Sequence, residues 1–316
     1  MGRKIIGSKR VTVSPEELLL GKIDPEKISC MSAFGAFAVA KLQAGCRQKT
    51  IVSYREHIAE FAKWCDSQSL AISDLTRSHV ERWEGILRLE RKNKDTSVQT
   101  KIKSIRTFLY WCMDEERGWL KPFSITLPRA DMTLKEPYTK EELTALLAPP
   151  ANEDLSEWRN WAAVGFISRT GVRLSSAVNL KWTDIDFEKH ICLLRHTKTN
   201  EQYFVPIPSA ALTDLLTWKA ISPETAEGYV FFSTYTEKKL SPNALTQAIR
   251  LYNLSRGVSK TSVHLLRHTF ATLYLQKGGR AEKLQKILGH KTADMTQRYV
   301  HYVTDDLVED IDDFTF

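Results

Sequence analysis

The sequence predicts a mainly α-helical protein with a small antiparallel β-sheet, divided into two domains. Apolar residues recur at the helical spacing of about 3.6 residues through most of the chain. Residues 191–195 and 203–207 are short β-rich runs, and the polar residues 196–200 between them favour a hairpin turn. Three prolines within residues 122–137 interrupt regular structure, and 316 residues is long for a single core. We therefore expect a helical domain followed by an α+β domain.

The first part of the chain is expected to form an N-terminal arm, residues 1–29, and a helical domain, residues 30–122. In the arm, Ser14 followed by a proline and two acids is typical of the start of a short helix. In the domain, Thr76 is placed to cap a helix that contains Trp83. Two longer apolar stripes predict the main helices: Ile51, Tyr54, Ile58, Phe61, Ala62 and Cys65 in one, and Val98, Ile102, Ile105, Leu109 and Cys112 in the other.

An interdomain linker, residues 123–137, leads to the second domain, residues 138–316. Thr139 and Glu142 form a capping box that begins its first helix. Gly289 is a stop signal for the last regular helix. The helices expected after the hairpin cover residues 209–220, 242–254, 264–277 and 281–288. The acidic tail, residues 304–316, carries an apolar stripe typical of a short amphipathic helix.

The charge of the chain favours a nucleic-acid partner. The net charge is +7, with 24 basic and 16 acidic residues in residues 1–135. Residues 136–316 hold 21 basic and 22 acidic residues, but six of the acids lie in the tail, where no base is found. Both domains without the tail are therefore basic, as a phosphate-binding surface requires. A solvated basic face is the alternative reading of this pattern.

Composition argues against several other classes. The five cysteines are scattered singly without a C-x-x-C pair, so neither a zinc knuckle nor a disulfide framework is indicated, and free thiols suit a reducing cytoplasm. No stretch of about 18 apolar residues predicts a membrane span. Residues 1–10 lack the apolar run of a signal peptide. We expect a cytoplasmic protein, and the nucleic-acid partner that the charge favours would place it at the nucleoid.

Six residues between positions 173 and 299 form a candidate site for phosphoryl transfer. The set supplies a nucleophile and several cationic or proton-donating groups, but no pair of carboxylates for a metal, and no cofactor is expected. A tyrosine can attack a phosphodiester while arginines neutralise the developing charge. The candidate catalytic residues are Arg173, Lys198, His264, Arg267, His290 and Tyr299.

Each of these residues has a plain structural reading when taken alone. Arg173 fits a surface salt bridge, Lys198 a solvated turn, and both Tyr299 and the rival nucleophile Tyr302 fit aromatic packing of the last helix. His264 and Arg267 lie at i and i+3 and share one helix face. A zinc-protease pattern would need a glutamate directly after His264, where the chain has a leucine, so His268 is expected to pack in the helix.

Five further basic residues are candidates for contacts with DNA phosphates. Three lie off the apolar stripe of the helix around residues 98–112, and two lie in the linker, where surface solvation is the alternative. They are Lys101, Lys103, Arg106, Arg129 and Lys135.

The six candidates occur in an order and in local strings that resemble the tyrosine recombinase, or phage integrase, family. The strings are H-x-x-R-H at residues 264–268, L-G-H at 288–290 and T-x-x-Y at 296–299. The resemblance implies that Arg173 and Arg267 clamp the phosphate and that Tyr299 is the nucleophile. It also implies that Lys198 protonates the leaving hydroxyl, that His264 handles a proton, and that His290 is the second histidine of the set.

The resemblance also implies a fold, a reaction and partners. Residues 30–122 would be a helical SAM-like core-binding domain, and residues 138–316 a mixed catalytic domain, which together clamp a DNA duplex. The family forms a 3′-phosphotyrosyl link, frees a 5′-hydroxyl and reverses the step on a partner strand, without metal or ATP. The implied partners are double-stranded DNA with inverted-repeat sites, a homotetramer on two duplexes that exchanges its tails, and accessory DNA-bending or directionality proteins.

The expected role is integration, excision or resolution of a mobile element. A type IB topoisomerase, which shares the phosphotyrosine chemistry but acts as a monomer, is one alternative, and a non-catalytic DNA-binding relative is another. One departure from the family pattern is plain. Where members usually carry an acid three residues after the first arginine, this chain has Ser176, and Asp184 or Asp186 is available to replace the missing carboxylate.

Overall fold

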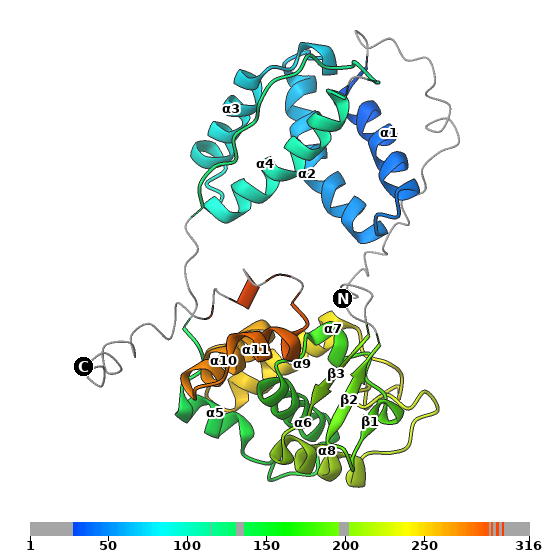
Figure 1. The fold of residues 1–316 in the computed structure, drawn as a ribbon, viewed down its shortest axis with the longest axis vertical. Helices are drawn as coiled ribbons and strands as arrows, with labels where there is room; N and C mark the ends of the chain where they lie inside the picture. Colours follow the sequence, from blue (N-terminus) through cyan, green and yellow to red (C-terminus); the bar gives the residue numbers. More distant parts are fainter. Residues whose placement is uncertain are drawn as a thin grey trace, which may run out of the picture. The chain divides into compact units, whose positions relative to one another are not determined.

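The structure is a computed structural model that describes residues 28–114, 116–130, 136–195, 202–290, 292, 295, 296 and 299. The chain splits into two compact units, Met1–Leu134 and Lys135–Phe316, each with its own hydrophobic core (Figure 1). The predicted arm helix near Ser14, Lys135, Lys198, Tyr302 and the tail lie outside the described residues. None of the helices in the described ranges is long and apolar enough to span a bilayer.

The first unit is a bundle of helices, as the apolar stripes predicted. It consists of α1 (Cys30–Gln43), α2 (Gln48–Ser67), α3 (Arg77–Gly85) with a π-helical extension (Ile86–Glu90), and α4 (Asp95–Cys112). Both predicted stripes face the core, where Phe61 and Phe108 are fully buried. Thr76 is the N-cap of α3, and its backbone N–H donates to His79 Nδ1 at 3.1 Å.

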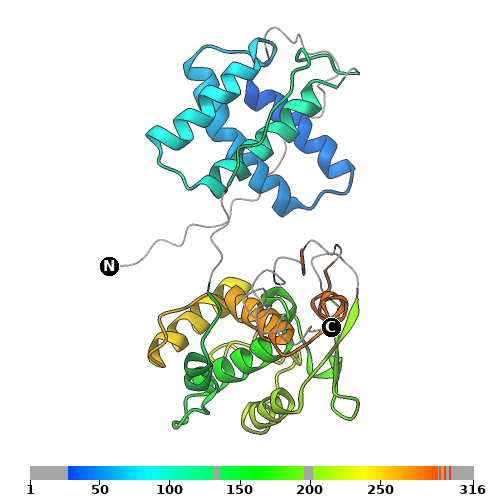
Figure 2. The same ribbon diagram turned by 60° about the vertical axis from the view of Figure 1, so that its left-hand side comes forward.

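The second unit combines helices with a three-stranded antiparallel sheet of order β1-β2-β3. The strands are β1 (Ile185–Asp186), β2 (Ile191–Leu194) and β3 (Tyr203–Pro206), and they lie side by side at one margin of the unit (Figures 1 and 2). The β2–β3 hairpin confirms the prediction from the two β-rich runs. Strand β1 was not expected, because two residues are too short to show a sequence period.

The helices of the second unit are α5 (Lys140–Leu147), α6 (Leu155–Thr170), α7 (Leu174–Ala177), α8 (Ser209–Ile221), α9 (Pro242–Ser255), α10 (Val263–Gln276) and α11 (Ala281–Leu288). Helix α6 is the centre of the core, since it is buried on every side along residues 161–167 and packs against α8, α9 and α10. The fold class predicted from the sequence, mainly helical with a small antiparallel sheet, is therefore confirmed.

The start of the second unit is tied to helix α10. Thr139 caps α5 through the predicted box, in which Glu142 N–H donates to Thr139 Oγ1 at 3.2 Å and Thr139 N–H donates to Glu142 Oε2 at 2.8 Å. The preceding residue, Tyr138, donates its backbone N–H to Thr269 Oγ1 at 2.9 Å and its hydroxyl to Lys260 O at 2.9 Å. Helix α10 carries two of the candidate catalytic residues, His264 and Arg267. The hydrogen bond from Tyr138 to Thr269 therefore attaches the beginning of the second unit to the helix that positions them.

Candidate active site

Two arginines from distant parts of the second unit converge on the C-terminal end of α11. Arg173, the N-cap of α7, donates from Nη1 to Leu288 O at 3.3 Å and from Nη2 to Gly289 O at 3.4 Å. Arg267, in α10, donates from Nη2 to Leu288 O at 2.9 Å and from Nη1 to Gly171 O at 2.6 Å. The unsatisfied carbonyls at a helix C-terminus carry partial negative charge, so they hold the two guanidinium groups in place.

Two glycines make this arrangement possible. Gly289 ends α11 at φ +60°, and a Cβ there would lie 2.5 Å from Cζ of Tyr203. Gly171 ends α6 at φ +66°, and a Cβ there would lie 2.7 Å from a methyl group of Leu288. A side chain at either position would be strained in its backbone and would push away the residues that shape the site. The glycines that end both helices, of which the sequence indicated Gly289, therefore also place carbonyls that the arginines use.

The site is electropositive and lacks a compensating acid among the described residues, where neither Arg173 nor Arg267 forms an ion pair with a carboxylate. Burial lowers the pKa of Arg267 to about 10, and the charge of Arg173 acts in the same direction. Arg267 is only 3% exposed, but its guanidinium is still protonated at neutral pH. The site therefore holds a buried positive charge. A phosphate anion would supply the missing counter-charge.

The position where the family usually has an acid holds a buried serine. Ser176 is 3% exposed, and its hydroxyl has no hydrogen-bond partner among the described residues. Asp184 instead pairs with Arg195, whose Nε lies 2.6 Å from Oδ1, and Asp186 accepts from the backbone N–H of Lys189 at 2.9 Å. Arg173 is thus supported by backbone carbonyls, and both carboxylates that were available to replace the acid have other partners.

His290 lies directly beside Arg267 and is 9% exposed. Its Nε2 is 2.8 Å from Nη2 of Arg267, and its Nδ1 is 2.8 Å from Oγ1 of Thr296. Burial lowers the pKa of His290 to about 4, and the charges of Arg267 and Arg173 act in the same direction. The imidazole is therefore neutral at pH 7.

The ring of Tyr299 lies against two imidazoles. It stacks on His290 with ring centroids 6.3 Å apart and an angle of 8°, and its centroid is 5.1 Å from that of His268. It also packs against the small apolar cluster formed by Ala271, Leu275, Leu284 and Leu288. Its phenol interacts electrostatically with Arg267, so the candidate nucleophile is next to a permanent positive charge. His268 is half-buried and lies against the Tyr299 ring, whereas the sequence suggested only packing within its helix.

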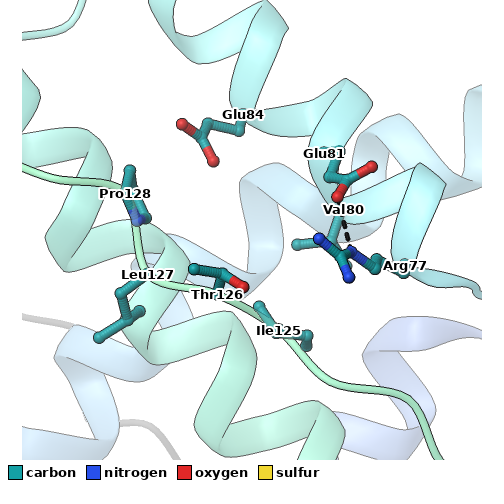
Figure 3. Close-up of a pocket in the computed structure, with 8 residues that line it drawn as sticks. All are labelled: Arg77, Val80, Glu81, Glu84, Ile125, Thr126, Leu127 and Pro128. Atoms are coloured by element: carbon teal, nitrogen blue, oxygen red, sulfur yellow. Dashed lines mark hydrogen bonds and ion pairs between the residues drawn. The ribbon is translucent and has the colours of Figure 1, made fainter.

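His264 is exposed and shares a pocket with Arg267. The pocket has a volume of about 240 Å³ and is lined by Val172, Leu174, Thr246, Ser262, Val263, His264 and Arg267. Because the two residues are three positions apart on α10, the exposed imidazole of His264 and the buried guanidinium of Arg267 line the same pocket. A smaller pocket of about 120 Å³ lies in the first unit between α3 and residues 125–128 (Figure 3). Its lining includes Arg77, which pairs with Glu81 at 2.7 Å, and Glu84.

The remaining candidates are placed only in part. Lys198 falls between β2 and β3, outside the described residues, and so do Tyr302 and Lys135. Lys101 is largely buried and pairs with Glu60, with 2.6 Å between Nζ and Oε2, and the same carboxylate oxygen also pairs with Arg91 at 3.3 Å. Lys103 and Arg129 are exposed, and Arg106 is half-buried.

Sequence reasoning missed two residues of the site. Tyr203 was assigned only to a strand, yet its hydroxyl donates to Leu288 O at 3.3 Å, and Arg267 and Arg173 partly offset the rise in its pKa that burial causes. Thr296 was noted only as a letter of the T-x-x-Y string, and it contacts His290. The string itself was the available signal for Thr296. Nothing in the sequence pointed to Tyr203, because its position depends on the register of the hairpin.

Comparisons with known families match both units. Residues 137–305 match the model of the phage integrase family, and residues 37–116 match that of the phage integrase N-terminal SAM-like domain. A tyrosine recombinase of Pseudothermotoga lettingae is 26% identical over 261 residues, which cover 80% of this chain and 87% of that protein. The tyrosine recombinase XerC of Bacillus pumilus is 27% identical over 267 residues, which cover 82% of this chain and 87% of that protein.

Solved structures of similar fold point the same way. The Tn1549 transposon integrase, solved in complex with a circular intermediate DNA, has a TM-score of 0.67 at 16% identity and covers 86% of this chain and 94% of its own. A lambda integrase dimer bound to a COC′ core site has a TM-score of 0.65 at 18% identity and covers 85% of this chain and 94% of its own. At these identities the likeness supports the fold.

Proposed function

This chain belongs to the phage integrase family of tyrosine recombinases, and from that premise we propose that it cleaves and rejoins duplex DNA at specific sites through a 3′-phosphotyrosyl intermediate. Its proposed role is the integration and excision, or the resolution, of a mobile element. The observation that carries the proposal is the convergence of Arg173, Arg267, His290 and Tyr299 at the end of α11. These four groups come from three separate regions of the sequence and meet in one electropositive site.

In the proposed reaction, the Tyr299 oxygen attacks the phosphorus of one strand. The bond from phosphorus to the tyrosine oxygen forms, and the bond from phosphorus to the 5′ oxygen breaks. The guanidinium groups of Arg173 and Arg267 bind the non-bridging oxygens and stabilise the charge that develops on them. They are fixed beforehand by the α11 carbonyls, so little reorganisation is needed when the charge develops. The 5′-hydroxyl of a partner strand then reverses the step.

Two residues complete the proposed chemistry. Lys198 gives a proton to the departing 5′ oxygen, as the family resemblance implies. His264, on the open side of the pocket that it shares with Arg267, takes up the proton that the Tyr299 hydroxyl loses as it attacks. Charge stabilisation by arginines takes the place of a metal ion in this proposal. The phosphodiester energy is kept in the phosphotyrosine, so no ATP is consumed.

The proposed partner is double-stranded DNA with inverted-repeat sites, bound in the cytoplasm at the nucleoid. A lambda integrase tetramer bound to a Holliday junction has a TM-score of 0.66 to this chain at 17% identity, covering 86% of this chain and 77% of its own. We extend that arrangement to this protein as a homotetramer on two duplexes, with residues 304–316 docked on a neighbouring protomer. Accessory DNA-bending or directionality proteins belong to the same proposal.

The decisive experiment is a search for a covalent adduct. A pool of labelled duplexes that tile the DNA on both sides of the coding region is incubated with the protein, and denaturing gels reveal protein-linked strands. We expect an adduct that forms in excess EDTA and that Tyr299→Phe abolishes while specific binding persists. An adduct in the Phe variant would assign the nucleophile to Tyr302 or another residue. Loss of the adduct on chelation, with recovery on adding Mg²⁺ or Zn²⁺, would exclude the metal-free reaction.

A plasmid assay and the adduct assay together distinguish the alternative functions. Relaxation of supercoiled plasmid without strand exchange between two sites would favour a topoisomerase-like activity. The duplexes include nicked substrates, which trap the cleaved strand. Specific binding to these duplexes without any adduct would favour a non-catalytic DNA-binding protein.

A further inference from the structure

Thr296, Arg267 and His290 form a buried hydrogen-bonded chain. His290 is at its centre, with Nε2 at 2.8 Å from the Arg267 guanidinium and Nδ1 at 2.8 Å from the Thr296 hydroxyl. Thr296 is 2% exposed, so its hydroxyl is shielded from bulk water. A buried hydroxyl next to a buried ring nitrogen restricts where the single proton of a neutral imidazole can lie.

The identity of the two partners fixes the tautomer of the free protein. A guanidinium has only hydrogen-bond donors, so Nε2 of His290 must be the acceptor. The proton of the neutral ring therefore lies on Nδ1 and is donated to Thr296 Oγ1. In this state, the nitrogen that faces Arg267 has no proton to offer to a phosphate oxygen.

A phosphate bound by Arg267 changes this requirement. A phosphate oxygen accepts the Nη2 N–H that faces His290, while the bond from Nη2 to Leu288 O is kept, and Nε2 then faces an acceptor rather than a donor. To donate, Nε2 must carry a proton, and a neutral ring must lose the proton on Nδ1. A hydroxyl is the one uncharged side-chain group of this size that both accepts from Nδ1–H and donates to bare Nδ1.

We propose that Thr296 is a positioning residue that holds the His290 ring in both tautomers and allows its proton to move from Nδ1 to Nε2 when phosphate binds. The Thr296 hydroxyl accepts in the free protein and rotates to donate in the complex. Water that reaches the ring when the site opens locally takes up the proton from Nδ1 and supplies the one that arrives at Nε2, so the ring stays neutral and no other reactant is needed. Thr296 lies three residues before Tyr299, whose ring is parallel to that of His290, so the hydroxyl also fixes the imidazole relative to the nucleophile.

The groups around His290 favour a neutral imidazole in the free protein. Arg267 from α10 and Arg173 from the start of α7 are cationic, burial raises the pKa of the Tyr203 phenol in β3, and the ring of Tyr299 lies parallel to that of His290. No described carboxylate pairs with either arginine, so nothing among these groups favours a charged ring before the anion arrives. The effect of Thr296 on DNA cleavage rests on the proposed function, whereas the His290 tautomer in the free protein does not.

The first test reads the tautomer directly. The protein is labelled with ¹⁵N-histidine, and the signals of His290 among the eight histidines are identified by their loss in His290→Gln. At pH 7 we expect a protonated Nδ1 and a bare Nε2 in the free wild type, and the reverse when inorganic phosphate is added at constant ionic strength. A protonated Nε2 in the free protein would overturn the proposal. Signals that stay unchanged up to the solubility limit of phosphate would also overturn it.

The second test compares two substitutions of matched size. Thr296→Val keeps the shape of the side chain and removes both the donor and the acceptor, and Thr296→Ser keeps the hydroxyl. We expect Thr296→Val to lower the cleavage rate by roughly tenfold to hundredfold at pH 8 with little change in duplex binding, and Thr296→Ser to remain close to wild type. The same duplex that forms the Tyr299 adduct is the substrate.

The pH dependence separates this role from simple packing. An imidazolium carries a proton on Nε2 whatever its partner at Nδ1, so acid should partly rescue the Val variant. The ratio of wild-type to Val cleavage rates should therefore shrink as the pH falls from 8 towards about 4, the pKa of the His290 ring. A ratio that is constant with pH, or a Ser variant as slow as Val, would show that only packing matters. If the wild type forms no adduct with any duplex, the proposed function fails while the tautomer measurement still decides the switch.

Discussion

Arg173 and Arg267 donate to the same acceptor, the carbonyl oxygen of Leu288, at 3.3 and 2.9 Å. Two cations that share one carbonyl repel each other, and each charge contributes to lowering the pKa of the groups between them. A phosphate that bridges both guanidinium groups would relieve this repulsion. We therefore expect that repulsion between these two positive charges in the free protein favours the binding of an anion.

The forked geometry of Arg267 is expected to be essential. Arg267→Lys keeps a positive charge, but an ammonium cannot donate to Leu288 O, Gly171 O and a phosphate from fixed planar positions. We expect the cleavage rate to fall by about 100-fold or more, with a smaller change in duplex binding. Arg250→Lys, at an exposed position of α9, is the control and should leave the rate unchanged. Full activity in Arg267→Lys would mean that charge alone is sufficient.

Gly289→Ala is expected to destabilise the second unit and to slow cleavage. Alanine at φ +60° costs about 1–2 kcal/mol, and its Cβ would also meet the Tyr203 ring at 2.5 Å. Gly278→Ala is a matched control, because Gly278 has φ +79° but nothing within 4 Å of the added Cβ. Urea unfolding of both variants should show a larger loss for Gly289→Ala, and only that variant should cleave slowly. Equal losses would show that the contact with Tyr203 has no energetic effect.

The helices and the hairpin were predictable because each had a local signal. Thr139 and Glu142 cap α5 as their spacing indicated, and the polar residues after Arg195 separate β2 from β3. The convergence of Arg173 with Arg267 could be inferred only through the family resemblance, since their contact at Leu288 joins three elements whose packing no local pattern encodes.

The rest of the site depended on distances that sequence spacing cannot give. Lys101 lies off an apolar stripe, and its contact with DNA phosphates stays a prediction; in the structure it pairs with Glu60 on the neighbouring helix α2. Asp184 was a candidate for the missing acid, but the antiparallel register of β1 and β2 brings Arg195 to it instead. In both cases the ion-pair partner lies on an adjacent element, and spacing along the chain gives no sign of it.

Stability should fall as the pH drops from about 6.5 towards 4. In the folded protein the pKa of His290 is lowered to about 4 by burial and by Arg267 and Arg173, so the unfolded chain takes up a proton that the buried ring does not. The full loss amounts to up to about 3 kcal/mol at the acid end of this window. Urea unfolding across this range should show a shallower pH dependence for His290→Gln than for the wild type. His190→Asn, at an exposed turn, is the control and should keep the wild-type slope.

Lys198→Ala is expected to slow cleavage of an ordinary duplex far more than cleavage of one with a sulfur in place of the bridging 5′ oxygen. An alkoxide is a poor leaving group and needs a proton as the bond breaks, whereas a thiolate leaves without one. A missing general acid therefore matters little for the sulfur substrate. Lys189→Ala, an exposed lysine in the turn before β2, is the control and should behave as wild type on both duplexes. Rates on the two substrates are compared by the appearance of the covalent adduct, with binding measured separately. If Lys198→Ala slowed both reactions equally, Lys198 would only bind phosphate, and the proton would have to come from another group such as His264, whose side chain opens to the same pocket as Arg267.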